Sequence, residues 1–472
     1  MLGLFTDLYE LKMAQVYLAR GMTERAIFTL SVRRLPKQRN YLLVCGQGPL
    51  VEKLAQLRFS DDDIAYLRRL ELFEDSFLAW LADFRFTGDI WAVPEGTPVF
   101  ANEPILELEA PLPQAQILET LVMNQITLST VLASKASRIV TAAKGRTVVD
   151  FAARRMMGVE AAVEGARAFA IAGIAATSNM MAGHRYGIPV SGTMAHAFVQ
   201  AHENEEAAFR AFAEAFPGST ILIDTYDTLE GLARAIRLAR DPGHPIRFSA
   251  VRIDSGDLLA LSKAVRSMLD EAGLHDVRIF ASSGLDEYRI ADLLAKGAPI
   301  DGFGVGTAMG VAADAPALDI VYKLVRYADR DTTKLSTGKP VLPGAKQIFR
   351  LFENGRATGD VIACRQEHAR GEPLLQPLVR NGRPTALATR SLEEIRHHAA
   401  EALARLPDAV RALSPANPPY PVAISEELQR KHAEVMTRIR NRHAVRESGK
   451  DKREKRHDPD RPACGRHGSH RG

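Results

Sequence analysis

The stretch Ile188-Pro-Val-Ser-Gly-Thr-Met-Ala-His196 predicts a short β-strand that runs into a polar turn. Pro189 lies near the expected start of the strand, where a missing backbone N–H is tolerated. Parallel sheets and α/β barrels place their chemistry at the carboxyl ends of strands. Because His196 follows such an end, it is a candidate base, ligand or phosphate acceptor, with an ordinary surface turn histidine as the alternative.

Five further strands of this kind are expected in the same part of the chain, with helices between them. The strands are predicted at 147–151, 220–225, 246–253, 277–282 and 300–306, and the helices at 159–175, 203–215, 228–240, 257–272 and 286–296. Strands that alternate with helices imply a parallel sheet. So many units in sequence favour a barrel over an open sheet. We therefore predict an α/β fold with an irregular, TIM-like parallel barrel over residues 145–315.

The flanking segments predict a smaller α+β domain. The N-terminal part of this domain covers residues 1–144. Residues 1–83 are expected to be mainly helical, with a helix cap at Thr6 or Asp7 and another at Ser60. Residues 84–113 are expected to be β-rich, and residues 114–143 are expected to be helical again. Residues 316–440 predict strands at 320–326 and 347–352 that return to the first β unit, and helices at 391–406 and 426–440. Residues 441–472 are low in apolar content, so we expect a disordered basic tail.

The composition is that of an ordinary globular protein, because 46% of the 472 residues are hydrophobic and 25% are charged. The formal net charge of +4 arises in the tail. Residues 441–472 hold ten Lys/Arg and five Asp/Glu, which leaves 51 basic and 52 acidic residues in 1–440. The body of the chain therefore offers no charge argument for nucleic-acid binding.

The sequence also predicts a cytoplasmic protein without a membrane partner. No apolar run reaches the ~20 residues of a membrane helix, and the first residues lack the pattern of a signal peptide. Cys45, Cys364 and Cys464 lie far apart and form no metal-type spacing. Such cysteine usage is typical of a reducing compartment.

Polar residues follow each of the six predicted barrel strands. In chain order the candidates are Asp150 and Arg154; Thr193 and His196; Asp224; Arg252 and Asp254; Ser283 and Gly284; and Gly304, Gly306 and Thr307. Glycines offer backbone N–H groups to a phosphate, carboxylates hold Mg²⁺ or ribose hydroxyls, and arginines bind carboxylate or phosphate. The set predicts a ligand with phosphates and hydroxyls, although each residue by itself is equally consistent with a cap or turn.

Six motifs, in this order, resemble those of nicotinate phosphoribosyltransferases over roughly residues 1–410. They are Thr6-Asp-Leu-Tyr9, Asp150-Phe-Ala-Ala-Arg-Arg155, Thr177-Ser-Asn179, Gly192-Thr-Met-Ala-His196, Val251-Arg-Ile-Asp-Ser-Gly-Asp257 and Gly304-Val-Gly-Thr307. The resemblance implies an irregular α/β barrel with a smaller domain assembled from both chain ends. It implies that nicotinate and phosphoribosyl pyrophosphate give nicotinate mononucleotide and pyrophosphate, in NAD biosynthesis, coupled to ATP hydrolysis and assisted by Mg²⁺.

The resemblance also assigns roles to positions of this chain. His196 matches the histidine that becomes phosphorylated, and it forms the expected catalytic set with Arg252 and Asp254. Nicotinate is expected to contact Tyr9, Arg154, Ser178, Thr193 and Arg252. Phosphoribosyl pyrophosphate is expected to contact Asp224, Asp254, Ser283, Gly284, Gly304, Gly306 and Thr307. The sequence singles out no metal ligands. The resemblance further implies a homodimer in which Tyr9 reaches the active site of the partner subunit.

The related nicotinamide phosphoribosyltransferases share the fold, so the choice between acid and amide depends on Ser178. In that class an aspartate is aligned with this position, and an aspartate repels a carboxylate. Ser178 leaves a carboxylate unopposed, which favours nicotinate. Three alternatives remain: a nicotinamide enzyme, a quinolinate phosphoribosyltransferase, and a catalytically inactive nucleotide-binding homologue. The intact His196, Asp254 and Arg252 argue against the last of these.

Overall fold

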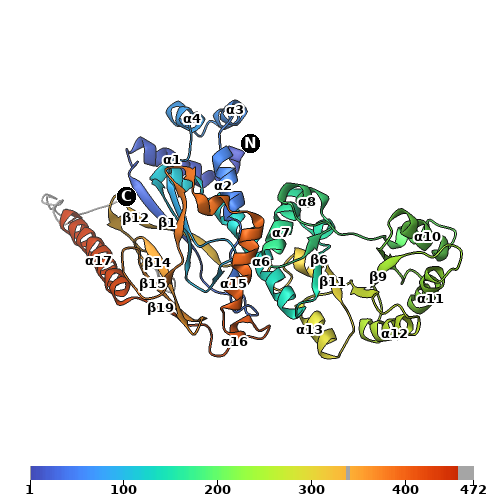
Figure 1. Ribbon diagram of the computed structural model, residues 1–472. Helices are drawn as coiled ribbons and strands as arrows, with labels where there is room; N and C mark the ends of the chain where they lie inside the picture. The colour runs from blue at the N-terminus through green and yellow to red at the C-terminus, as the bar shows by residue number, and fades with distance from the viewer. Residues whose placement is uncertain (1, 336–340, 455–472) are drawn as a thin grey trace, which may run out of the picture.

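The protein is described by a computed structural model that covers residues 2–335 and 341–454, with side chains described to residue 442. Its chain forms two bodies that lie side by side (Figure 1). One body holds antiparallel sheets built from both ends of the chain, and the other holds a parallel sheet wrapped by helices. One large hydrophobic core lies within the antiparallel body, and a second one joins the parallel sheet and its helices to parts of the antiparallel body such as Leu43 and Ala399.

A seven-stranded sheet joins the two ends of the chain. Its order is β13 (Arg330–Asp331), β12 (Ile320–Tyr327), β1 (Arg25–Val32), β5 (Pro104–Pro111), β3 (Asp89–Ala92), β17 (Gln376–Arg380) and β18 (Arg383–Pro384). All its pairings are antiparallel. A short sheet pairs β2 (Leu42–Leu43) with β4 (Pro98–Val99). The predicted α+β unit assembled from N- and C-terminal segments is therefore confirmed.

The N-terminal helices share one hydrophobic core with this sheet. They are α1 (Leu8–Ala19), α2 (Gln47–Gln56), α3 (Asp61–Arg69), α4 (Asp75–Ala82), α5 (Leu112–Ile117) and α6 (Glu119–Ala142), after a 3-10 turn at Leu2–Leu4. Asp7 is the N-cap residue of α1, and Ser60 forms a capping box with Asp63 at α3, as expected. The prediction that residues 1–83 are mainly helical is wrong for 25–32. That segment is strand β1, and the alternation of apolar and polar residues over Phe28-Thr-Leu-Ser-Val32 is the pattern of a strand, even though both faces are buried.

The parallel sheet is a six-stranded half-barrel. Its order is β7 (Ala176–Thr177), β6 (Thr147–Asp150), β11 (Gly302–Val305), β10 (Arg278–Ala281), β9 (Phe248–Ile253) and β8 (Ser219–Leu222). Its helices are α7 (Val159–Ile171), α8 (Met180–Tyr186), α9 (His196–Gln200), α10 (Glu205–Ala215), α11 (Thr228–Ala239), α12 (Leu258–Glu271), α13 (Glu287–Ala295) and α14 (Thr307–Gly310), with a 3-10 turn at Ala153–Arg155. The predicted α/β class with an irregular parallel barrel is confirmed, and the barrel is present as a half-barrel of six strands.

One strand of this sheet differs from the sequence prediction. The segment 188–191 forms only an isolated parallel bridge between Val190 and Thr177, and the strand proper is β7, which precedes it. Val190 is exposed, so its apolar side chain does not fix a strand face. Pro189 has no N–H to donate, which also limits the ladder. The turn that leads to His196 is nevertheless held at the sheet edge, since Ser191 N–H donates to the Thr177 carbonyl.

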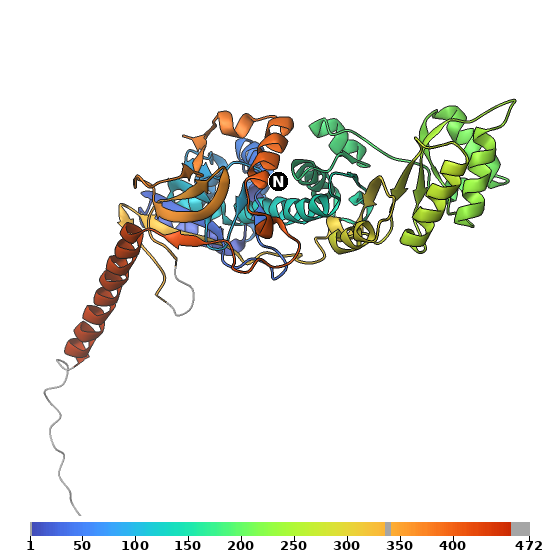
Figure 2. The same cartoon turned by 60° about the horizontal axis from the view of Figure 1, so that its bottom comes forward.

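The C-terminal part adds a fourth sheet and a long helix. The sheet has the order β16 (Glu372–Pro373), β14 (Lys346–Glu353), β15 (Arg356–Cys364) and β19 (Val422–Ile424). The remaining elements are α15 (Leu392–Ala404), α16 (Asp408–Arg411), α17 (Glu426–Glu454) and a 3-10 turn at Ala386–Thr389. Figure 2 shows α17 extending away from the body.

The expected disordered tail at 441–472 is contradicted in its first part, because α17 continues to Glu454. Arg, Lys and Glu have high helix propensity, which sustains a helix without an apolar face. Residues 455–472 lie outside the described residues. None of the helices in the described part of the chain combines the length and the apolar composition of a membrane crossing.

Candidate active site

The half-barrel brings its strand ends to one edge. Neighbouring parallel strands pair near their carboxyl ends, as in Leu222 with Arg252 and Val305 with Asp150. The polar residues that follow these strands therefore lie in one row, as the sequence predicted.

Asp224 and Asp254 are joined directly across the ends of β8 and β9. Asp224 Oδ2 accepts hydrogen bonds from the Asp254 backbone N–H at 2.8 Å and from the Ser255 hydroxyl at 2.7 Å. Asp254 Oδ1 accepts from the Ser282 hydroxyl at the end of β10. Asp224 Oδ1 is buried and has no hydrogen-bond partner among the described residues. A buried carboxylate oxygen in that state is a ready acceptor for a hydroxyl or a cation.

His196 is the first residue of the short helix α9 and faces this acidic pair. Its Nδ1 lies 3.2 Å from the Thr225 hydroxyl, and its Nε2 lies 3.7 Å from Asp254 Oδ2. The histidine and aspartate side chains are 38% and 34% exposed, so both remain accessible to a ligand. The sequence predicted these two residues in one site, and the structure brings them together.

Arg252 projects from β9 toward the turn before His196. Its Nη1 donates to the Thr193 hydroxyl at 2.8 Å, and its guanidinium lies 6.0 Å from the centroid of the Phe151 ring. Burial lowers the pKa of Arg252, an effect that the nearby Asp254 and Asp224 oppose. Its Nε has no partner among the described residues and is buried. The guanidinium is therefore placed to bind an anionic group.

Asp150 organises the other edge of the sheet. Its carboxylate accepts from the Ala152 N–H at 2.8 Å and from the Thr177 hydroxyl at 2.7 Å, while its carbonyl accepts from the Ser178 N–H at 2.9 Å. Burial raises the pKa of Asp150, which those two hydrogen bonds to the carboxylate oppose. Ser178 is thereby fixed with an exposed side chain, and Arg154 is exposed nearby.

The glycine turns pack tightly against the Phe151 residue. A Cβ on Gly304 would lie 2.3 Å from the Phe151 ring, so only glycine fits there. Gly306 precedes α14, and Thr307 is exposed at its first position. After β10, Ser283 and Gly284 adopt positive φ angles of 79° and 56°. This backbone conformation is strained for serine.

Tyr9 is the predicted site residue that the chain does not bring to this row. It lies in the first turn of α1, in the other body of the molecule (Figure 1). Its side chain is 47% exposed and lines a hollow of about 570 Å³ with Glu119, Thr120 and Asn124. A direct role for Tyr9 in the strand-end site therefore requires a second copy of the chain.

Four residues of the row had no role in the sequence prediction: Phe151, Thr225, Ser255 and Ser282. Each stands within a strand-end motif. Their types are common in turns and cores, and only the contacts described above distinguish them. The one usable signal was their position beside the polar strand ends.

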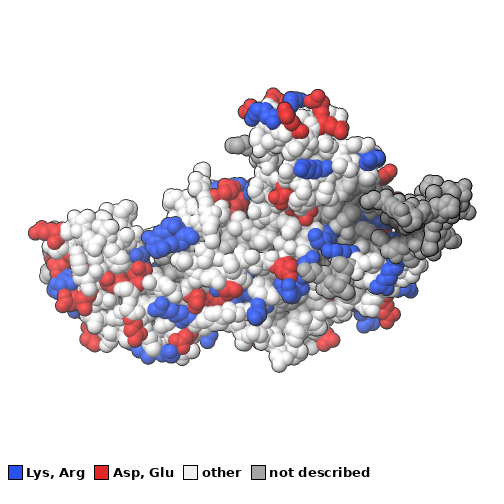
Figure 3. All heavy atoms as spheres, turned by 180° about the vertical axis from the view of Figure 1, so that it is seen from behind, with Lys and Arg blue, Asp and Glu red and all other residues white. Residues whose placement is uncertain are grey.

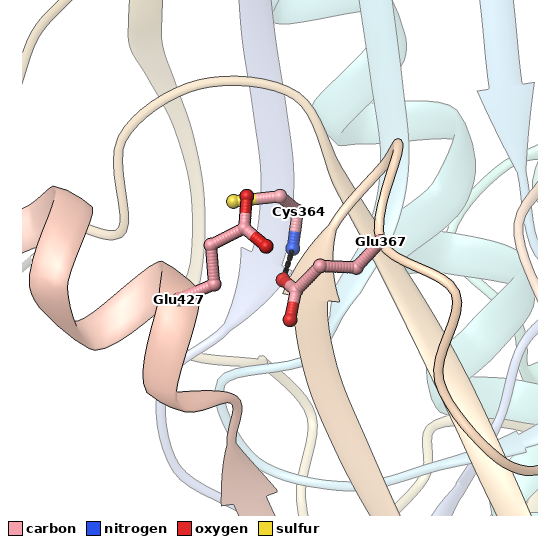
Figure 4. Close-up of side chains that lie close together, drawn as sticks. All are labelled: Cys364, Glu367 and Glu427. Atoms are coloured by element: carbon pink, nitrogen blue, oxygen red, sulfur yellow. Dashed lines mark hydrogen bonds between the residues drawn. The ribbon is translucent and has the colours of Figure 1, made fainter.

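A second cluster lies far along the chain, where Cys364, Glu367 and Glu427 approach one another (Figure 4). Their potential ligand atoms lie within 4.8 Å of one another. Glu367 Oε2 already accepts from the Cys364 N–H at 2.6 Å and from the Ser425 hydroxyl at 2.8 Å. Burial raises the pKa of the Cys364 thiol, which favours the neutral form. We assign this cluster a structural role that joins β15 to the start of α17.

On the face in Figure 3, basic and acidic side chains are interspersed in small groups between wide uncharged areas. This agrees with the nearly balanced charge of residues 1–440.

The half-barrel with its polar strand ends defines an α/β protein of the class that binds small ligands at the carboxyl edge of a parallel sheet. Family models match nearly the whole chain: the nicotinate phosphoribosyltransferase N-terminal domain over residues 4–127, the family's central model over 147–358 and its C-terminal domain over 367–432. The chain belongs to the nicotinate phosphoribosyltransferase family.

Individual relatives agree with this assignment. The chain is 52% identical to the pncB2 nicotinate phosphoribosyltransferase of Mycobacterium tuberculosis, over 90% of this chain and 92% of that protein. It is 43% identical to the nicotinate phosphoribosyltransferase of Bacillus subtilis, over 79% of each chain. The crystal structure of human nicotinic acid phosphoribosyltransferase superimposes with a TM-score of 0.81 at 26% identity, covering 91% of this chain and 99% of that one.

Proposed function

We propose that the protein joins nicotinate to 5-phosphoribosyl 1-pyrophosphate, giving nicotinate mononucleotide and pyrophosphate, with ATP hydrolysis coupled through phosphorylation of His196. The observation that carries this proposal is the contact between His196 and Asp254 beside the Asp224 carboxylate. The site combines an accessible imidazole with two carboxylates and a buried guanidinium.

Asp224 and Asp254 fit a Mg²⁺-bound diphosphate. Carboxylate oxygens are the ligands that Mg²⁺ prefers, and Asp224 Oδ1 is buried without a partner among the described residues. Bound there, Mg²⁺ neutralises charge that develops on the departing pyrophosphate. The carboxylates are also suited to accept hydrogen bonds from ribose hydroxyls. The turns at Gly304–Thr307 and Ser283–Gly284 supply backbone N–H groups and hydroxyls for the phosphates.

Nicotinate is assigned to the space between Arg252, Thr193 and Ser178. The buried guanidinium attracts the carboxylate, and the Thr193 hydroxyl holds that guanidinium in place. The Ser178 side chain carries no negative charge, so the site prefers the acid nicotinate over the amide nicotinamide. The ring nitrogen is already a nucleophile, and transfer passes through an oxocarbenium-like state. Positioning and charge stabilisation therefore supply most of the catalysis.

His196 is assigned the phosphoryl transfer from ATP. The Asp254 carboxylate favours the tautomer whose Nε2 carries the proton, which leaves the lone pair on Nδ1 facing Thr225. A ring nitrogen attacks the γ-phosphorus of ATP, the bond to the ADP oxygen breaks, and a phosphoramidate forms. The phosphohistidine then tightens phosphoribosyl pyrophosphate binding until its hydrolysis drives the reaction forward.

A homodimer completes the site. Helix α1 and the segment that precedes it expose Phe5, Leu8, Tyr9, Met13 and Val16. Around α7 and α8 the chain exposes Met157, Val159, Met180 and Met181, beside a hollow of about 530 Å³ that Ser178 also lines. An isologous dimer that seats the first set on the second buries both and carries Tyr9 to the partner's nicotinate.

The experiment that tests this proposal measures pyrophosphate release from phosphoribosyl pyrophosphate with nicotinate, nicotinamide or quinolinate, each with and without Mg-ATP. We expect nicotinate to be used with the highest kcat/KM and ATP to stimulate that reaction alone. Preference for nicotinamide or quinolinate contradicts the acid assignment. No pyrophosphate release with any acceptor supports an inactive nucleotide-binding homologue.

A further inference from the structure

Tyr9 lies among three carboxylates at the junction of α1 and α6. Asp7 and Glu10 belong to the start of α1, and Glu119 is the first residue of α6. Tyr9 and Glu119 line the same hollow, and the Glu119 carboxylate is an acceptor beside the Tyr9 hydroxyl. The tyrosine side chain is thus half exposed, while its hydroxyl lies next to a carboxylate.

Glu119 is itself fixed in position. Gln116 Nε2 donates to Glu119 Oε2 at 3.0 Å, and burial raises the pKa of Glu119 while Lys323 on β12 opposes that shift. A side chain held by its own neighbours can orient another one. Glu119 therefore restricts where the Tyr9 hydroxyl points.

The backbone of Tyr9 is fixed separately by Glu10, which is 0% exposed. Glu10 Oε1 accepts from the Thr120 N–H at 3.1 Å and from the Thr120 hydroxyl at 2.7 Å, and Oε2 accepts from the Thr6 hydroxyl. Asp7 Oδ2 also accepts from Thr120, at 2.8 Å. These contacts hold the first turn of α1 to α6, so the remaining freedom of Tyr9 is that of its side chain.

We propose that Glu119 is a positioning residue that orients the Tyr9 ring for the nicotinate bound in the second copy of the chain. This inference rests on the proposed function, in which Tyr9 completes the partner's site. Glu119 acts through the Tyr9 hydroxyl and does not itself contact the substrate. Because Tyr9 is expected to contact the ring in both ground and transition states, loss of its orientation weakens binding more than turnover.

The test is a double-mutant cycle on the full-length protein with Tyr9→Phe, Glu119→Ala and the double variant. We expect Glu119→Ala to raise the KM for nicotinate by about fivefold, while kcat and the KM for phosphoribosyl pyrophosphate change less than about twofold. Tyr9→Phe should have the same effect, and the double variant should be no worse than either single one. Glu119→Gln, which keeps an acceptor oxygen, should restore most of the loss.

Asn124→Ala is the matched control, because Asn124 is exposed on α6 and lines the same hollow. It should leave all constants unchanged. Additive effects in the double variant, or equal losses in every constant, overturn the positioning role. Tyr9→Ala separates the two levels of the argument. If this variant leaves the KM for nicotinate unchanged, the assignment of Tyr9 to the partner's site is wrong.

Discussion

His196 Nε2 lies 3.7 Å from Asp254 Oδ2 across the carboxyl edge of the half-barrel. The two residues come from different βα units, and Asp254 is tied through its backbone N–H to Asp224. A histidine that carries a phosphoryl group and a carboxylate that serves the diphosphate would therefore be adjacent. This adjacency gives a physical route by which phosphorylation at one residue affects substrate binding at the other.

The first prediction concerns His196→Ala. The variant should retain slow transfer and lose stimulation by ATP, because the phosphoryl acceptor is gone while the transfer residues remain. We expect the KM for phosphoribosyl pyrophosphate measured with ATP to rise roughly 5- to 150-fold, the usual size of a coupling between two sites. Steady-state kinetics with and without Mg-ATP measure this.

His275→Ala is the control for that variant, since His275 is 70% exposed and pairs with Asp270 away from the strand ends. It should behave as the unmodified enzyme does. ATP stimulation that survives in His196→Ala would remove His196 from the phosphoryl route.

The second prediction concerns the acidic pair. Asp254→Asn should lower kcat roughly 10²- to 10³-fold, because a charge aligned for the transition state is lost. The Mg²⁺ concentration that gives half-maximal activity should also rise. Mg²⁺ titration of pyrophosphate release measures both effects. A reduced kcat with an unchanged Mg²⁺ dependence would restrict the role of Asp254 to binding the ribose hydroxyls.

The third prediction tests acid against amide. Ser178→Asp places a negative charge where the carboxylate of nicotinate is expected, and like charges at short range repel. We expect the ratio of kcat/KM for nicotinate to that for nicotinamide to fall roughly 5- to 30-fold, or about 1–2 kcal/mol. Ser178→Asn is the neutral control of similar size. Equal effects of both substitutions would show that size, and not charge, is sensed.

The fourth prediction follows from Glu10. Burial raises the pKa of Glu10 to about 7, although hydrogen bonds from Thr6 and Thr120 oppose the shift. A carboxyl whose pKa is raised on folding stabilises the protein below its unfolded pKa of 4.5, and that contribution is lost as pH rises through 7. Urea unfolding should show a loss on the order of 3 kcal/mol over this window. Glu10→Gln should flatten that part of the profile, and an unchanged slope would contradict the assignment.

Much of the half-barrel could be predicted from sequence, because its short apolar strands alternate with capped helices. The positions of β6, β8, β9, β10 and β11 follow from that rhythm. Strand β1 could have been predicted as well, since Phe28-Thr-Leu-Ser-Val32 alternates apolar and polar residues in the way that is typical of a strand. The isolated bridge between Val190 and Thr177 depends on how segment 188–191 lies against the sheet, and not on the side chains of that segment.

The site shows the same division. Motif order predicted His196, Arg252, Asp224 and Asp254, and the structure places them together. The hydroxyls of Thr225, Ser255 and Ser282 became visible only as contacts, since serine and threonine are common at turns. The spacing of residues in the sequence gives no indication that Tyr9 and Glu119 lie beside each other, because their proximity depends on how α1 packs on α6.

The most direct test of the account is intact-mass analysis of the protein after incubation with Mg-ATP, with acid and neutral quench compared. The account predicts one added phosphoryl group that is stable at neutral pH, lost in acid, absent from His196→Ala and mapped to His196. An unmodified mass, or an acid-stable phosphate at another residue, would contradict the phosphohistidine route.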